Sequence, residues 1–328
     1  MTEELKKGTT RRDFLIRAVK AAAALAATGA AGYRFRTNII PVADVSGDRA
    51  FTLPDFSVAG HAGKMAIATG TDRVRMLNRA IDAIGGIGSF VKTGDRVLIK
   101  VNAAFATPPM LCATTNPDLL AEIVRLCRSS GASVAVTDNP INDPVSCFEL
   151  TGIADAARRS GATLWVPKAD SFRPMTLPGG RLIRNWPFLS TPFQGITKLI
   201  GVAPVKDHHR AGASMIMKNW YGLLGGTRNV FHQDIHNIVK ELALLVKPTL
   251  AILDGTMTMM TNGPTGGSVD DLKATGALVV STDQVAADGF GVTLLGRKAA
   301  DLPYITKAAA AGAGTANFEL LNPVRING

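Results

Sequence analysis

The chain has 328 residues, of which 46% are apolar and 19% charged, and its formal net charge is +10. This length and apolar content allow a large buried core, so a disordered chain is excluded and one large α/β domain or two smaller lobes are expected. Residues 1–36 carry +5 of the net charge, and the rest has no Lys/Arg-rich run, so nucleic-acid binding has little support.

The N-terminal segment has the pattern of an export signal. Arg11 and Arg12 precede a weakly apolar, Ala-rich stretch over residues 21–31. This pattern is typical of twin-arginine signals, so we expect residues 1–31 to be recognised by the twin-arginine export machinery and the protein to be periplasmic. An uncleaved signal would anchor the protein in the membrane. Because this route carries folded proteins, it favours a bound metal or cofactor.

An α/β domain is predicted over residues 64–328, after a linker or N-terminal extension at 32–63. Within it, apolar strand-like runs alternate with amphipathic helices, and runs such as 97–99 are apolar without alternation, as in strands covered on both faces. The order predicts a mainly parallel, doubly wound sheet flanked by helices. The predicted strands are 65–70, 96–102, 133–140, 163–167, 250–255 and 277–283, and the predicted helices are 73–84, 116–131, 148–161, 231–248 and 284–296.

Polar residues end several of the predicted strands. Ligands of parallel sheets bind beyond the carboxyl ends of the strands, so Lys100 with Asn102, Asp138 and Asp254 are candidate ligand-binding residues. Asp283 is better explained as a helix N-cap, and an Asx-turn explains Asp138 equally well. A buried Lys100 ammonium requires a carboxylate or an anionic ligand beside it.

Four of the five histidines lie between positions 208 and 236. His232 and His236 are four residues apart in the helix predicted at 231–248, so they project from the same face and could share a metal ion or an anion. His208, His209, Asp234 and Asp254 are candidates for a further ligand, judged from sequence only. The alternative, which the spacing alone favours, is that both histidines are boundary residues hydrogen-bonded to the backbone.

Two glycine-rich segments suit close approach of the backbone to an anion. The first, MKNWYGLLGGTRN at 217–229, contains Lys218, Asn219 and Arg228. The second, TNGPTGGS at 261–268, contains Asn262, and an ordinary turn explains it somewhat better when it is viewed alone. Neither segment is a P-loop, and the chain lacks the G-x-S-x-G and H-E-x-x-H motifs of serine hydrolases and zinc proteases.

The three cysteines do not identify a cofactor. Cys112, Cys127 and Cys147 form no C-x-x-C pair, so an iron–sulfur cluster and a structural zinc site are not expected. Cys127 falls on the apolar side of a predicted helix, where a small buried hydrophobic residue is expected.

The motifs taken in order resemble a known family. RVLIKVN, KDHHRAGASMIMKNWYGLLGGTRN, FHQDIH and KPTLAILDGTMTMMTNGPTGGS are similar to motifs of the family catalogued as domain of unknown function 362, and the resemblance extends over residues 64–315. Many relatives carry ferredoxin-type cysteines and are described as iron–sulfur proteins, whereas others, often with twin-arginine signals, lack them. The resemblance places this chain with the second kind. Where relatives usually read I-K-P-N, this chain has Val101, which leaves Lys100 and Asn102 intact.

Two classes of function follow. In the first, the protein binds a divalent metal or a cofactor, and one form of it is an enzyme acting on a small anionic substrate. In the second, it is a noncatalytic accessory protein that captures an anion or organic cofactor for an exported redox system. A scaffold with structural histidines and an iron–sulfur redox protein are disfavoured. For the first class, the expected metal ligands are His232, His236 and Asp254, the expected catalytic residues are His208, His209 and Lys218, and the expected ligand-binding residues are Lys100, Asn102, Asp138, Asn219, Arg228 and Asn262.

Overall fold

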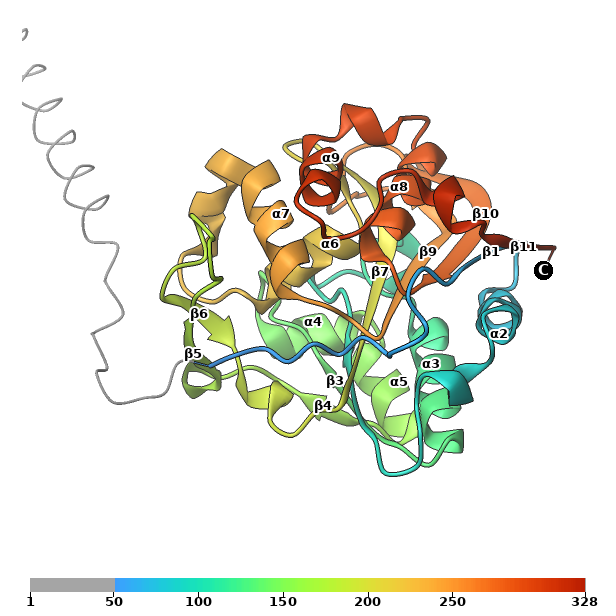
Figure 1. Ribbon diagram of the computed structural model, residues 1–328, viewed down its shortest axis with the longest axis horizontal. Helices are drawn as coiled ribbons and strands as arrows, with labels where there is room; N and C mark the ends of the chain where they lie inside the picture. Colours follow the sequence, from blue (N-terminus) through green and yellow to red (C-terminus); the bar gives the residue numbers. More distant parts are fainter. Residues whose placement is uncertain (1–50, 328) are drawn as a thin grey trace, which may run out of the picture. The chain divides into compact units, whose positions relative to one another are not determined.

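The computed structural model describes residues 51–327 (Figure 1). The predicted signal at 1–31 and the first part of the linker lie outside these residues. No helix within 51–327 is long and apolar enough to cross a membrane.

A mixed sheet of nine strands, most of them in parallel pairs, forms the centre of the fold. Its order is β11-β1-β10-β9-β7-β2-β3-β4, with β8 paired to β7, and β5 and β6 form a separate hairpin. Strands β4, β3, β2, β7 and β9 run parallel, whereas β10 is antiparallel to β9 and β1. The strands are β1 Met65–Thr69, β2 Arg96–Lys100, β3 Ser133–Thr137, β4 Thr163–Trp165, β5 Phe172–Met175, β6 Trp186–Leu189, β7 Lys198–His208, β8 Gly212–Ser214, β9 Leu250–Met259, β10 Leu272–Ser281 and β11 Val324–Asn327.

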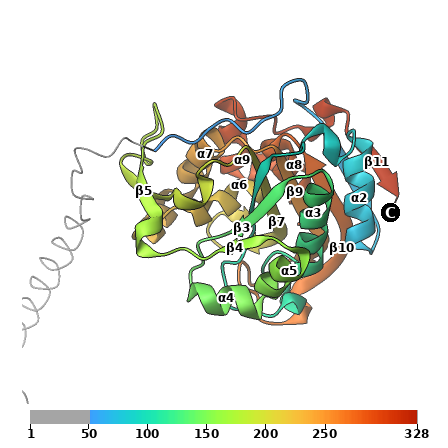
Figure 2. The ribbon, with the colours of Figure 1, turned by 90° about the horizontal axis from the view of Figure 1, so that it is seen from below.

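Helices cover both faces of this sheet. Helices α2, α3 and α5 pack on one face and α6 to α9 on the other, which Figures 1 and 2 show as a blue-to-green group and a yellow-to-red group. The α-helices are α2 Arg73–Ala83, α3 Pro117–Ser129, α4 Pro144–Leu150, α5 Ile153–Ser160, α6 Ile216–Asn219, α7 Ile235–Leu245, α8 Gln284–Leu294 and α9 Pro303–Ala310. The 3-10 helices are η1 Ile87–Ser89, η2 Pro109–Leu111, η3 Ala169–Ser171, η4 Thr191–Phe193, η5 Trp220–Leu223, η6 Arg228–Asp234, η7 Val269–Asp271, η8 Ala299–Asp301 and η9 Phe318–Leu321.

The two-sided core confirms the doubly wound α/β prediction. In β2, Val97 and Ile99 belong to the core under α2, α3 and α5, whereas Leu98 belongs to the core under α6 to α9, and all three are fully buried. A strand buried on both faces has no polar face, which explains why its sequence does not alternate. Cys127 lies in the first of these cores, as expected of a small buried hydrophobic residue.

Side-chain caps set several helix starts. Helix α3 begins after Asn116, whose Oδ1 accepts from the amides of Asp118 and Leu119. Asp283 caps α8 in the same way, as predicted. The single helix predicted at 148–161 is instead part of two helices, because the chain turns at Gly152, which has a φ of +74°.

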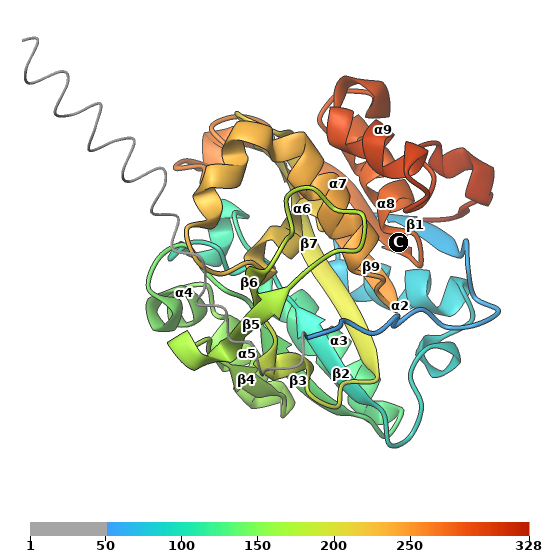
Figure 3. The ribbon, with the colours of Figure 1, turned by 60° about the vertical axis from the view of Figure 1, so that its left-hand side comes forward.

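The end predicted for the strand at 250–255, which is β9, was wrong. Asp254 was expected to end this strand, but β9 continues to Met259. It pairs with β10 in the antiparallel direction, so the sheet is mainly, but not entirely, parallel. Long strands β7 and β9 lie side by side near the middle of the molecule (Figure 3).

Candidate functional site

A cavity of about 280 Å³ lies at the carboxyl ends of β2, β3 and β7. Strand β2 is the point where the strand order changes direction: β3 and β4 lie on one side of it, and β7 and β9 on the other. Ligands of open α/β sheets bind at such points. We call this cavity the lysine–histidine pocket, since its walls include Lys100, Lys206, Lys218, His208, His209 and His232.

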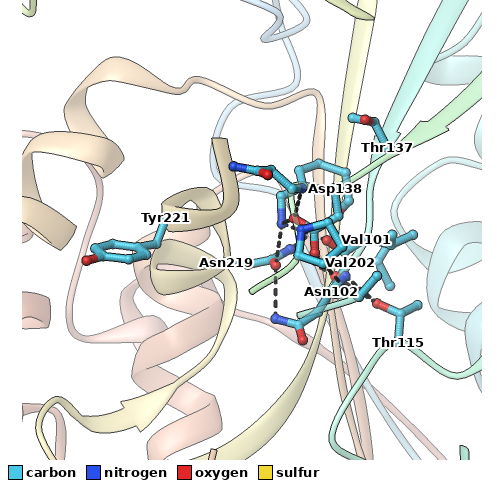
Figure 4. Close-up of polar contacts among 12 residues, drawn as sticks. Val101, Asn102, Thr115, Thr137, Asp138, Val202, Asn219 and Tyr221 are labelled. Atoms are coloured by element: carbon cyan, nitrogen blue, oxygen red, sulfur yellow. Dashed lines mark hydrogen bonds and ion pairs between the residues drawn. The ribbon is translucent and has the colours of Figure 1, made fainter. Parts of the chain in front are cut away.

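The floor of the pocket is a fully bonded polar network around Lys100. The ammonium of Lys100 forms an ion pair of 2.7 Å with Asp138 Oδ1 and donates to Asn219 Oδ1 at 2.7 Å. Asn219 also accepts from Asn102, and its amide group donates to the backbone of Val202 (Figure 4). The predicted need of Lys100 for a carboxylate is therefore met by Asp138, and burial still lowers the pKa of Lys100.

Three further cations face the cavity without a carboxylate, namely Lys206, Lys218 and Arg228. The ammonium of Lys206 donates to the backbone carbonyl of Ala113, and that of Lys218 lies 5.2 Å above the Tyr221 ring. Among the described residues, Lys218 has no hydrogen-bond acceptor and no ion-pair partner. Because Asp138 is the one acidic residue of the lining and is paired with Lys100, the pocket has an excess of positive charge.

Burial and this excess of positive charge lower the pKa values of Lys206 and Lys218. Burial, and then the neighbouring charge of Lys218, lower the pKa of Lys206 to about 7. Burial, followed by the charges of Arg228 and Lys100, lowers the pKa of Lys218 to about 8. An anion in the pocket would reverse both shifts, because an opposite charge favours the protonated ammonium.

Arg228 connects two segments that line the pocket. Its guanidinium donates to the backbone carbonyls of Leu224 at 3.0 Å, Asn139 at 2.7 Å and Pro140 at 3.1 Å. These bonds join the glycine-rich segment 217–229 to the loop after β3. Arg228 therefore contributes its charge to the pocket while its N–H groups hold the two segments together.

Three of the predicted histidines meet in the pocket. The His208 ring stacks between those of His209, at a centroid distance of 5.0 Å, and His232, at 6.0 Å. Burial, and then the charge of Lys218, lower the pKa of His208 to about 2 and also lower the pKa of His232. His208 and His232 are therefore held in the neutral form.

Three predicted site residues, His236, Asp254 and Asn262, do not line this pocket. His232 lies in η6 and His236 in α7, so the predicted single helix, with both rings on one face, is wrong. His236 stacks on Tyr304 with 6.3 Å between the ring centroids, and Asp254 pairs with Arg73 at 2.9 Å.

The metal ligands expected from spacing are therefore not assembled. Across residues 51–327 there is no group of three His, Cys, Asp or Glu residues placed to hold a metal ion. Asn262 donates to Asp271 rather than to the pocket, although Pro264 and Thr265 of the same loop do line it.

Sequence reasoning missed Lys206 and Tyr221. Lys206 stands directly after the apolar run 199–205, which is the signal that identified Lys100, so the same rule could have found it. Tyr221 has no such signal. Its importance comes from a hydroxyl that contacts His232 Nδ1 at 3.2 Å, and this contact depends on the turn between α6 and η6.

The family model described as Domain of unknown function (DUF362) matches residues 97–293, which include the whole lysine–histidine pocket. The thylakoid-associated protein sll1697 of Synechocystis sp. is 26% identical over 261 residues, covering 76% of this chain and 78% of that protein. The solved structure of the lactate racemase apoprotein from Thermoanaerobacterium thermosaccharolyticum aligns with a TM-score of 0.41 and 14% identity over 73% of this chain, and the alignment covers 58% of the racemase chain.

Proposed function

This chain belongs to the family described as Domain of unknown function (DUF362), and we propose that it binds a small anionic molecule in the lysine–histidine pocket. The observation that carries this proposal is the ammonium of Lys218, which faces the cavity and has no acceptor among the described residues. Lys218 is half-buried, and a bound carboxylate, phosphate or sulfate group would give its ammonium a charge-assisted hydrogen bond.

The dimensions of the pocket favour a small ligand. A cavity of about 280 Å³ is at the lower end of the range for ligand pockets. An adjoining cavity of about 470 Å³ shares Ile141, Tyr221, Arg228 and His232 with it and is also lined by Phe172. The anionic group of the ligand would occupy the inner cavity, and a less polar part would extend into the outer one. A substrate and an organic cofactor would both satisfy this chemistry.

Replacement of Lys218 tests the proposal. The melting temperature of the protein would be measured against sulfate, oxalate and 2-oxobutanoate, with potassium chloride at equal ionic strength as the reference. Lys218→Met should weaken anion binding roughly 10- to 150-fold, since a charge-assisted hydrogen bond contributes about 1.5–3 kcal/mol. Lys218→Arg should retain part of the affinity. The control is Lys273→Met, which removes an exposed lysine of β10. Equal anion-dependent stabilisation in all four proteins would refute an anion site at Lys218.

We also propose that the protein is exported through the twin-arginine pathway, on the basis of Arg11 and Arg12 before the Ala-rich stretch. Replacing both arginines with lysine should retain the full-length protein in the cytoplasm, as measured by cell fractionation. An equal periplasmic fraction for the variant and the wild type would rule out this route.

A further inference from the structure

Hydrogen bonds to the backbone fix opposite tautomers for His208 and His232. His208 Nδ1 accepts from the amides of Arg210 at 3.1 Å and Ala211 at 3.2 Å. A backbone amide can only donate, so Nδ1 carries the lone pair and, in the neutral ring, Nε2 carries the proton. The ring is only 2% exposed and lines the pocket, and no protein acceptor for Nε2 is found among the described residues. His208 thus presents an N–H donor to a ligand.

His232 has the opposite tautomer. Its Nδ1 lies 3.2 Å from the carbonyl oxygen of Asn229 and 3.2 Å from the hydroxyl oxygen of Tyr221. The single hydroxyl proton of Tyr221 is donated to the carbonyl of Arg228, so both neighbours of Nδ1 act as acceptors. The proton of His232 is therefore on Nδ1, and Nε2 has a free lone pair. The described residues offer no donor to that lone pair.

A hydrogen-bond donor, a base and a cation thus lie together on one small cavity. The ring centroids of His208 and His232 are 6.0 Å apart, so one small molecule can contact both. Abstraction of a proton next to a carbonyl group needs these three parts: a base for the proton, a donor for the oxygen that becomes negative, and a cation for the rest of the anion. A neutral imidazole suits the donor role, as in triosephosphate isomerase, because it polarises a carbonyl without charging the site.

We propose that the lysine–histidine pocket enolises a small anionic carbonyl compound, with His232 as the base and His208 as the donor to the carbonyl oxygen. The inference rests on the proposed anion site at Lys218. His232 Nε2 takes the proton from the carbon beside the carbonyl group. The electron pair of the broken C–H bond forms a C=C bond, and the carbonyl π pair moves to the oxygen, which accepts the hydrogen bond from His208 Nε2–H. Reversal returns the proton, so no oxidant, reductant or co-reactant is required.

The environment of the histidines favours these neutral forms. Lys218 and Lys206 face the rings from α6 and β7, His209 stacks on His208, and Arg210 adds charge near His232. Across the pocket, the carboxylate of Asp138 is bound to Lys100. Burial and these cations lower the pKa values of both histidines, so His232 is unprotonated and His208 stays neutral at ordinary pH.

Proton exchange in D₂O tests the inference without a cofactor. The full chain would be incubated with 2-oxobutanoate as the carboxylate probe and with dihydroxyacetone phosphate as the phosphate probe, and loss of the carbon-bound proton signal would be followed by NMR. We expect exchange of at least one probe, and a 100- to 10,000-fold slower exchange in both His232→Gln and His232→Ala. The probe that exchanges identifies the anionic group.

His208 should respond differently to the same pair of substitutions. In His208→Gln, the amide oxygen can accept from Arg210 and Ala211 while the amide N–H still donates to the ligand. Exchange should therefore be higher in His208→Gln than in His208→Ala, whereas the two His232 variants should be equally slow. His236→Gln, which changes a ring stacked on Tyr304 outside the pocket, should exchange like the wild type.

Measurements of probe binding and of the histidine tautomers separate failure of the enolisation inference from failure of the anion site. If a probe stabilises the wild type through Lys218 but does not exchange faster than in His232→Ala, the enolisation inference is overturned and the anion site stands. If no probe binds, both fail. Long-range ¹⁵N NMR of the ligand-free protein should assign the proton to Nε2 in His208 and to Nδ1 in His232, and the opposite tautomer at either residue would overturn the assignment.

Discussion

Lys100 ends β2 and Lys206 lies near the end of the neighbouring β7, and both are 1% exposed, but different groups neutralise them. Lys100 has the carboxylate of Asp138, whereas Lys206 has only carbonyl and amide oxygens and the Phe105 ring, 5.3 Å away. A buried ion pair is compensated within the protein, and a buried ammonium without a carboxylate is compensated only in part. At the scale of single residues, Lys100 therefore organises the pocket and Lys206 adds the charge that a ligand can use.

The ion pair of Lys100 depends on a glycine above it. A Cβ atom at Gly222 would clash with Asp138 Oδ1 and lie 2.8 Å from Lys100 Nζ. Gly222→Ala should therefore displace a buried pair and lower the free energy of unfolding by about 2–4 kcal/mol, as measured by urea denaturation. Gly267→Ala is the matched control, since nothing lies within 4 Å of its Cβ position. Similar unfolding free energies for the two variants would contradict this role for Gly222.

Among the elements, α6 and its continuation η5 have the largest effect on the site. They carry Lys218, Asn219 and Tyr221, and the Trp220 ring lies directly on Gly201 of β7, where a side chain would clash. Asp288 of α8 caps the start of α6, because its carboxylate accepts from the amides of Ile216 at 2.8 Å and Met217 at 3.1 Å. A four-residue helix has little stability of its own, so this cap determines where its side chains lie.

Asp288→Ala should therefore reduce anion affinity as well as stability. The substitution leaves two buried amides without acceptors and should cost about 2–5 kcal/mol of unfolding free energy. Because Lys218 follows on the same helix, we expect anion affinity to fall at least severalfold in protein that is still folded, measured by calorimetric titration with oxalate. Asp143→Ala removes an exposed cap from α4 that does not line the pocket, and should lower stability by about 1 kcal/mol while leaving affinity unchanged. Unchanged affinity in both variants would show that the cap does not position Lys218.

Local sequence patterns predicted the elements near β2 and β3 better than those near η6. In the first region, apolar runs, Asn116 and Lys100 each follow a local rule, so the strand starts, the α3 cap and the need for an ion pair could be predicted. In the second, the helical spacing of His232 and His236 was misleading, because the chain forms a 3-10 helix up to Asp234 and α7 begins only at Ile235. The stacking of His208 on His232 joins residues 24 positions apart, and no local pattern encodes such a contact.

For the whole molecule, the distribution of charge matters more than the net value of +10. Several surface charges are paired, as in Arg159–Asp155 and Arg325–Glu319. The lysine–histidine pocket instead concentrates Lys206, Lys218 and Arg228 around a cavity with a single, paired carboxylate. A cleft with low-dielectric walls and one sign of charge attracts small anions from solution. Binding should therefore weaken with added salt, although less steeply than at an exposed site.

This charge makes anion binding depend on pH. The ligand-free pKa values are about 7 for Lys206 and about 8 for Lys218, both below the ordinary value of 10.5. A bound anion favours the protonated ammonium and raises both values, so binding takes up protons between the free and bound pKa values. Sulfate keeps its charge over this range and is a suitable probe. Its affinity should fall as the pH rises from about 6 to about 9.

The stability of the ligand-free protein should change in the opposite direction. A lysine whose pKa is lower in the folded state than in the unfolded chain stabilises the fold at high pH, and that contribution is lost as the pH falls through the folded-state pKa. The free protein should thus gain stability from Lys206 and Lys218 as the pH rises above about 7, while the stabilisation added by sulfate declines. Calorimetric titration in two buffers with different ionisation enthalpies measures the proton uptake directly, and Lys218→Met should reduce it. Proton release on binding, or an affinity that does not vary with pH, would mean that these lysines do not hold the anion.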